Sequence, residues 1–152
     1  MSDYYNSRRT KGLFDPTSGE PFKVSRSKID LFLNCELCFY LDRRLGVSRP
    51  PGFPFNLNSA VDTLLKKEFD LHRKAKSSHP LMDAYGLKGI VPYQNEKMDE
   101  WRDALKRGIT VLHKPTNLGV GGGVDEVWVN DKGELIIVDY KATSKDEKVS
   151  LE

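Results

Sequence analysis

Two aspartates and a lysine stand within otherwise apolar, strand-like sequence toward the end of the chain. Asp125 lies in the run Gly123-Val-Asp-Glu-Val-Trp-Val-Asn130, and Asp139 and Lys141 lie in Ile136-Ile-Val-Asp-Tyr-Lys141. Burying an unpaired charge costs several kcal/mol, so charges placed in this way require a partner. A divalent metal ion with a phosphate group beside it would be such a partner.

The spacing of these residues predicts that they converge. Successive side chains of a strand point to opposite faces, so Asp139 and Lys141 share one face, with Cα atoms roughly 6.6 to 6.8 Å apart. Residues 130–133 predict a hairpin turn. If Gly133 adopts a left-handed bulge conformation, Asp125 lies opposite Asp139, whereas a register slip by one residue would remove the alignment.

Two facing carboxylates repel each other unless a cation lies between them. Mg²⁺ and Mn²⁺ favour oxygen ligands, and a bound ion lowers the pKa of its water and stabilises charge on a reacting phosphate. Lys141 would position or deprotonate the attacking water. A further carboxylate, Asp62 or Glu68, could come from the helix predicted over residues 57–75, and the sequence leaves that choice open.

A purely structural interpretation of the same residues also remains open. The segment Asp139-Tyr-Lys141 is compatible with a strand end where polarity resumes, and Asp125 with a cap on a turn after the glycine run. Under this interpretation Glu68 pairs with a lysine.

The positions of apolar residues and of helix-ending residues predict the elements that carry these side chains. Residues 1–22 are polar and predict a flexible N-terminal arm, and residues 23–152 predict one domain. Within it we expect helical sequence from about 25 to 45, ended by Gly46, then helices at 57–75 and 96–107, the last with Trp101 and Leu105 inward. Strands are expected at 109–113, 123–130 and 134–142.

Bulk properties exclude some classes of protein. The chain has 152 residues, with 38% hydrophobic and 30% charged, which fits a globular domain. No apolar run approaches the roughly 20 residues of a membrane span, so we expect no membrane association. The net charge is only +2, so any nucleic-acid binding must come from local basic patches. Two cysteines in one C-x-x-C indicate a reducing, cytoplasmic location.

Four motifs together resemble the PD-(D/E)XK nuclease superfamily, in its RecB-like exonuclease branch, over residues 24–143. The first is Ser25-Arg-Ser-Lys-Ile-Asp-Leu-Phe-Leu-Asn-Cys35 followed by aromatic residues, which resembles the opening helix of the family. Asn58-Ser-Ala-Val-Asp62 resembles its G-x-x-x-H helix. Gly123-Val-Asp125 resembles its G-x-x-D strand, and Val138-Asp-Tyr-Lys141 resembles its D-x-K strand, the most specific of the four.

The resemblance implies an α/β (α+β) fold with a restriction-endonuclease-like core, in which helices flank a central mixed β-sheet. It implies a Mg²⁺- or Mn²⁺-dependent deoxyribonuclease that acts in DNA repair, recombination or CRISPR-type processing, with DNA and helicase or recombination proteins as partners. Carried over to this sequence, Asp125 and Asp139 would be metal ligands and Lys141 the catalytic lysine. With the two rival helix carboxylates added, the expected catalytic residues are Asp125, Asp139, Lys141 and Glu68, and the expected metal ligands are Asp62, Asp125 and Asp139.

The chain also departs from the pattern of that branch. Asn58 and Asp62 stand where a glycine and a metal-binding histidine are usual, and aspartate remains a suitable ligand for Mg²⁺. The family usually continues into a Q-x-x-x-Y helix, but only 11 residues follow Lys141, so we expect an incomplete domain at the C-terminus. This leaves a non-catalytic DNA-binding or partner-binding module as the alternative function.

Cys35 and Cys38 are further candidates for binding a metal. Some relatives bind a [4Fe–4S] cluster through one early cysteine and three late ones, and the late three are absent here. Because two thiols do not complete a four-ligand site, Cys35 and Cys38 are expected to pack in the core.

Overall fold

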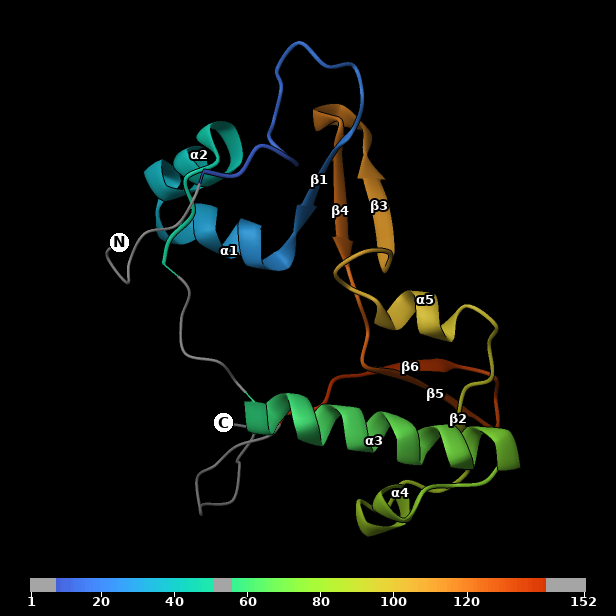
Figure 1. The fold of residues 1–152 in the computed structure, drawn as a ribbon. Helices are drawn as coiled ribbons and strands as arrows, with labels where there is room; N and C mark the ends of the chain where they lie inside the picture. Colours follow the sequence, from blue (N-terminus) through green and yellow to red (C-terminus); the bar gives the residue numbers. More distant parts are fainter. Residues whose placement is uncertain (1–7, 51–55, 142–152) are drawn as a thin grey trace. The chain divides into compact units, whose positions relative to one another are not determined.

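The structure is a computed structural model that describes residues 8–50 and 56–141, with side chains of the second range from residue 58 onward. The chain is mixed α/β, and the strands described form two separate three-stranded sheets, not the single central sheet that was expected (Figure 1). It divides into two compact units, residues 1–53 with 104–123 (unit 1) and residues 54–103 with 124–152 (unit 2). The segments 1–7 and 142–152, at the ends of the predicted arm and last strand, lie outside the described residues.

Unit 1 combines a three-stranded sheet with two helices. The sheet order is β1-β4-β3, with β1 parallel and β3 antiparallel to β4. The elements are β1 (Phe22–Ser25), α1 (Arg26–Asn34), α2 (Glu36–Leu45), β3 (Ile109–His113), the 3₁₀ turn η1 (Lys114–Thr116) and β4 (Leu118–Gly122). Strand β3 matches its prediction, and β1 was not predicted.

The glycine-rich segment forms a strand of its own, β4, which ends before residue 123, where the sequence predicted a strand to begin. A larger residue in β4 would crowd side chains of the neighbouring strands. A Cβ added at Gly121 would lie 2.7 Å from Lys23 Cε and 2.9 Å from Thr110 Oγ1. Glycine therefore leaves room for side chains of both neighbouring strands, a use that β propensity alone does not reveal.

The helical sequence at 25–45 is broken into two helices at Cys35. That residue has φ −166° and ψ 101°, which is extended backbone, and it serves as the C-cap of α1 and the N-cap of α2. Gly46 ends α2 in the left-handed region at φ 74°, as predicted. The predicted arm is held at its described end, where Arg9 binds Asp42 and the Phe14 amide donates to the Arg43 carbonyl.

Unit 2 places a long helix against an antiparallel sheet of order β2-β5-β6. The predicted helix at 57–75 is confirmed, and β2 and α4 were not predicted. The elements are α3 (Asn56–Ala75), α4 (Pro80–Ala84), β2 (Ile90–Pro92), α5 (Met98–Arg102), β5 (Glu126–Asn130) and β6 (Leu135–Val138).

The core of unit 2 lies between α3, α4 and the sheet. Phe69, Met82 and Trp128 are buried together, and the Phe69 ring stacks on His79 at 4.1 Å between centroids and on Trp128 at 5.7 Å. Tyr140 also packs against Phe69. These contacts fix the face of α3 that turns toward β5 and β6, and hence the direction of its other side chains.

The third predicted helix is much shorter than expected. Residues 96–107 were predicted to be helical, but α5 ends at Arg102, and Leu105, predicted to point inward, is 95% exposed. The side chain of Arg102 reaches Glu126 and Asp70 at 2.6 and 2.9 Å. Within the described residues, none of the helices has the length and hydropathy of a transmembrane span.

Candidate functional site

Four of the five predicted site residues line one pocket in unit 2. The pocket has a volume of about 370 Å³ and lies between the start of α3 and the strand ends of the β5–β6 hairpin. Its lining consists of Asn58, Ser59, Val61, Asp62, Asp125, Asp139, Tyr140 and Lys141. The structure therefore brings Asp62, Asp125, Asp139 and Lys141 together.

The hairpin has the register that the sequence predicted. Gly133 has φ 79°, and its amide donates to the Asn130 carbonyl at 3.0 Å. Strands β5 and β6 pair with Glu126 opposite Val138. The next positions along the same register are Asp125 and Asp139, just beyond the last paired residues. This register, extended by one position, agrees with the conditional prediction that these two aspartates come opposite each other.

Asp125 is fixed by contacts from three directions. The Tyr140 amide donates to its Oδ2 at 2.8 Å, and Lys66 Nζ lies 3.4 Å from its Oδ1. Arg102 Nε donates to the Asp125 carbonyl at 3.1 Å. Both the backbone carbonyl and the carboxylate of Asp125 are therefore held by hydrogen bonds. A residue of a binding or catalytic site needs such a fixed position.

Lys66 lies between two of the predicted metal ligands. Its Nζ is 2.8 Å from the Asp62 carboxylate and 3.4 Å from Asp125, and the lysine side chain is 22% exposed. Asp62 and Lys66 are one helical turn apart on α3, so their pairing follows from i, i+4 spacing. The ammonium group therefore supplies positive charge where two carboxylates approach each other.

Asp139 and Lys141 form an ion pair at the more exposed side of the pocket. Their side chains are 58% and 74% exposed, so both can reach a molecule arriving from solvent. Tyr140, between them in sequence, points instead into the core. Burial first, and then the Glu126 carboxylate, raise the pKa of the Tyr140 phenol, which keeps it neutral.

Glu68 lies outside this pocket. Its carboxylate is 3.5 Å from His79 Nε2, on the part of α3 that faces α4. Glu68 lies six positions after Asp62, and at 100° per residue that is roughly 240° around the helix axis. Of the two carboxylates that the sequence left open, the structure brings Asp62 to Asp125 and directs Glu68 to a histidine.

The donor set suits a hard cation, but the side chains are not gathered around one. Three carboxylates line the pocket, and oxygen donors of this type are those that Mg²⁺ and Mn²⁺ prefer. As the side chains stand, no three His, Cys, Asp or Glu residues in the described part of the chain are grouped closely enough to hold a metal ion. Lys66 holds Asp62 and Asp125 in their present positions.

Sequence reasoning missed two contributors to the site. Lys66 was not among the predicted site residues, although its i, i+4 spacing from Asp62 was available as a signal. Glu126 follows Asp125 directly and is completely buried, where it binds Arg73 and Arg102. Its role depends on arginines from two other elements, which no local pattern connects to it.

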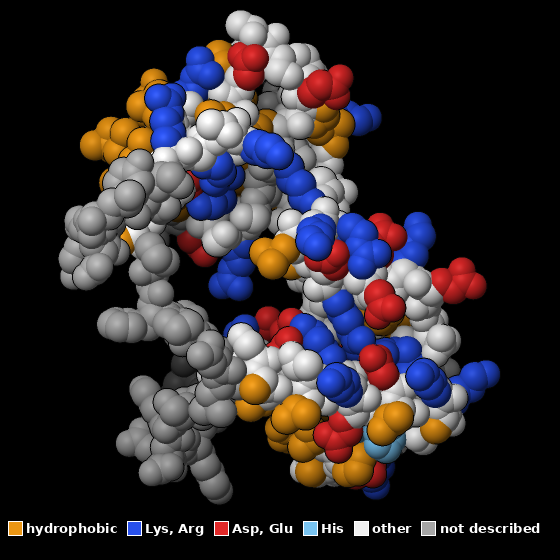
Figure 2. Space-filling model, in the orientation of Figure 1, with side chains coloured by type: hydrophobic (Ala, Val, Ile, Leu, Met, Phe, Trp, Pro, Cys, Tyr) orange, Lys and Arg blue, Asp and Glu red, His pale blue; other side chains and the backbone are white. Residues whose placement is uncertain are grey.

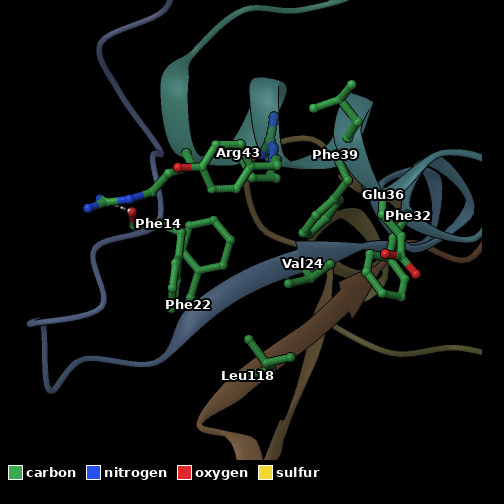
Figure 3. A pocket seen from close by; sticks show the side chains of 11 residues that line it. Phe14, Phe22, Val24, Phe32, Glu36, Phe39, Arg43 and Leu118 are labelled. Atoms are coloured by element: carbon green, nitrogen blue, oxygen red, sulfur yellow. Dashed lines mark hydrogen bonds between the residues drawn. The ribbon is translucent and has the colours of Figure 1, made fainter.

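A second, larger pocket lies in unit 1 and has a different character. It has a volume of about 740 Å³ and is lined mainly by aromatic and aliphatic side chains, among them Phe14, Phe22, Phe32 and Phe39 (Figure 3). Arg43 also lines it, but its guanidinium donates to Asp42. The pocket contains no arrangement of carboxylates comparable to that of unit 2.

The surface charge is mixed. On the face seen in Figure 2, lysine and arginine side chains lie interspersed with aspartate and glutamate, in keeping with the net charge of +2.

The chain matches no protein-family model, no curated protein and no solved structure.

Proposed function

We propose that the chain is a metal-dependent DNA nuclease that hydrolyses phosphodiester bonds. The proposal depends on one observation: Asp62, Asp125, Asp139 and Lys141, distant in sequence, line the same pocket. Three carboxylates and an amine in one pocket are the groups that metal-assisted hydrolysis of a phosphate ester requires. The resemblance of the sequence to RecB-like nucleases at Asp125, Asp139 and Lys141 suggests DNA as the substrate.

Under this proposal, each side chain has a defined task. Asp62, Asp125 and Asp139 would hold Mg²⁺ or Mn²⁺, which when bound activates water and neutralises phosphate charge. Lys141 is exposed and would contact the scissile phosphate or orient the attacking water. The Tyr140 amide holds Asp125 in place for this purpose.

The fold proposed to support this activity is a restriction-endonuclease-like core centred on α3 and the β2-β5-β6 sheet of unit 2. The proposed setting is DNA repair, recombination or CRISPR-type processing in the cytoplasm, with helicase or recombination proteins as partners. These assignments come from the resemblance of the sequence motifs.

Cleavage of labelled single- and double-stranded DNA with Mn²⁺ tests the proposal. We expect Lys141→Ala and Asp139→Ala to lower the cleavage rate at least about a hundredfold, the usual size of such losses. Lys132→Ala and Asp83→Asn change exposed residues away from the pocket and serve as controls. Equal cleavage by the wild type and both pocket variants would contradict the proposal.

One observation favours a second function, a DNA-binding or partner-binding module without catalysis. Each pocket carboxylate already has a cationic neighbour, since Lys66 forms ion pairs with Asp62 and Asp125, and Lys141 forms one with Asp139. A pocket neutralised from within needs no metal ion. This function predicts DNA affinity that falls steeply with added salt, no turnover with any metal, and no heat of Mn²⁺ binding in calorimetry.

A further inference from the structure

The two cysteines lie at the start of a helix and not in the core. Cys35 is the N-cap of α2, and its Sγ accepts a hydrogen bond from the Cys38 amide at 3.3 Å. Both thiols are free and half-buried, so the expectation that they pack in the core is wrong. A thiol at a helix N-terminus faces the positive end of the helix dipole, which favours its thiolate form.

A cation reinforces this effect. The Arg49 guanidinium lies beside the sulfur atoms of both Cys35 and Cys38. Contacts with the Cys38 thiol and amide, and the charge of Arg49, lower the pKa of the Cys35 thiol. Glu36, the acidic residue of the first turn of α2, has its side chain at the apolar pocket of unit 1 (Figure 3).

The geometry also permits a bond between the two sulfur atoms. Residues three apart at a helix start have Cα atoms roughly 5 Å apart, from the rise and radius of the helix. Disulfides span Cα distances of about 4.4 to 6.8 Å. A disulfide between Cys35 and Cys38 therefore requires no rearrangement of α2.

We propose that Cys35 and Cys38 are a redox-active dithiol that undergoes thiol–disulfide exchange, with Cys35 as the attacking thiolate. The substrate class is a disulfide, RS–SR. Cys35 attacks one of its sulfur atoms, the S–S bond breaks, and one RS⁻ leaves and takes a proton from water. Cys38 gives its proton to water and attacks the Cys35 sulfur, which releases the second RS⁻. The dithiol loses two electrons and the disulfide gains them.

The first test measures which thiol is activated. The single-cysteine variants Cys38→Ser and Cys35→Ser are treated with iodoacetamide at pH 7, folded and in urea. We expect Cys35 to react about three- to tenfold faster than Cys38 in the folded protein and at the same rate in urea, because a lowered thiol pKa raises the thiolate fraction more than it reduces nucleophilicity. Equal rates in the folded protein would overturn the proposal.

The second test follows the exchange itself. The wild-type chain is incubated with oxidised glutathione, alkylated and weighed by mass spectrometry. We expect the wild type to lose two hydrogens and carry no glutathione, and Cys38→Ser to retain one glutathione on Cys35. Stable glutathione adducts on the wild type would overturn the proposal. Arg49→Gln, added to the single-cysteine variants of the first test, should bring the alkylation rates of Cys35 and Cys38 together. Arg26→Gln, which changes an exposed arginine of α1, serves as the control. Alkylation rates unchanged by Arg49→Gln would remove Arg49 from the mechanism.

Discussion

Lys66 is the residue on which the proposed metal site depends most directly. Its ammonium lies between the Asp62 and Asp125 carboxylates, in the region that a bound cation would share. An internal cation competes with an external one because both are attracted to the same carboxylates. The pocket can therefore hold a metal only if Lys66 moves away or its charge is outweighed.

This competition predicts the effect of removing the lysine charge. Lys66→Met should raise the affinity for Mn²⁺ about five- to tenfold, which corresponds to about 1 to 1.4 kcal/mol, the size of one partly screened ion pair. Titration calorimetry with Mn²⁺ measures the change. Lys67→Met, which alters the exposed neighbour on α3, should leave the affinity unchanged. Weaker binding by Lys66→Met would mean that the lysine supports the site.

Asp42 is a single residue whose ion pairs should affect the stability of the fold. It is buried in unit 1, and its carboxylate binds Arg9, Lys28 and Arg43. Burial alone would raise the pKa of Asp42, but the hydrogen bonds and charges of Lys28 and Arg43 outweigh burial and lower the pKa to about 2. Asp42 thus remains ionised at every physiological pH.

The lowered pKa predicts how stability depends on pH. Because an unfolded aspartate titrates near pH 3.9, the folded state is favoured above that pH, by about 2 kcal/mol, and this advantage is lost as the pH falls from about 4 toward 2. Asp42→Asn should lower the free energy of unfolding at pH 7, and its difference from wild type should shrink toward pH 2. Urea unfolding followed by circular dichroism measures both. The exposed Asp83→Asn should show neither change.

At the scale of elements, an ion network connects β5 to two helices of unit 2. Glu126, with no exposed surface, binds Arg73 of α3 and Arg102 of α5, and Asp70 binds the same two arginines. The side chain of Glu126 also accepts a hydrogen bond from the Val127 amide at 2.8 Å. The network holds β5 in place and therefore also the preceding residue, Asp125.

Removing the central charge should destabilise unit 2 strongly. Glu126→Gln leaves two largely buried guanidinium groups with the partly exposed Asp70 as their remaining carboxylate partner. Breaking a buried ion pair in this way costs about 3 to 5 kcal/mol. Both tryptophans of the chain, Trp101 and Trp128, lie in unit 2, so urea unfolding followed by tryptophan fluorescence reports the loss. Glu96→Gln alters an exposed carboxylate before α5 and should change stability by less than about 0.5 kcal/mol. A similarly small change in Glu126→Gln would show that the arginines are solvated in solution.

The elements also show what the sequence could and could not predict. Helix α3, strand β3 and the hairpin turn with Gly133 were predictable, because periodicity and turn residues act locally. The short strands β1 and β2 were missed because their residues acquire strand geometry from partners distant in sequence, such as β4 and β5. The convergence of Asp125 and Asp139 could be inferred from the turn. Which of Asp62 and Glu68 faces the pocket depends on the orientation of α3 about its own axis, and the core contacts of α3 set that orientation.

At the scale of the whole molecule, each compact unit is assembled from two segments of the chain. Unit 1 takes β1, α1 and α2 from residues 1–53 but β3 and β4 from residues 104–123. Strand β1 pairs only with β4 among the described strands. The sequence predicted one domain over residues 23–152, although a proline-rich segment at residues 50–54 and a glycine run at residues 121–123 lie at two of the three points where the division occurs.

The interleaved construction predicts how the chain responds to cutting. A fragment of residues 1–53 has no partner for β1, so the amides of Lys23, Val24 and Ser25 should exchange with deuterium as fast as in an unfolded chain. A chimera that joins residues 1–53 to residues 104–123 through a short Gly/Ser linker restores β4, and loop closure adds little cost for a linker of this kind. Hydrogen exchange measured by NMR should then show those amides protected about as in the full chain. Protection of the same amides in the fragment alone would mean that α1 and α2 suffice to order β1 without a sheet.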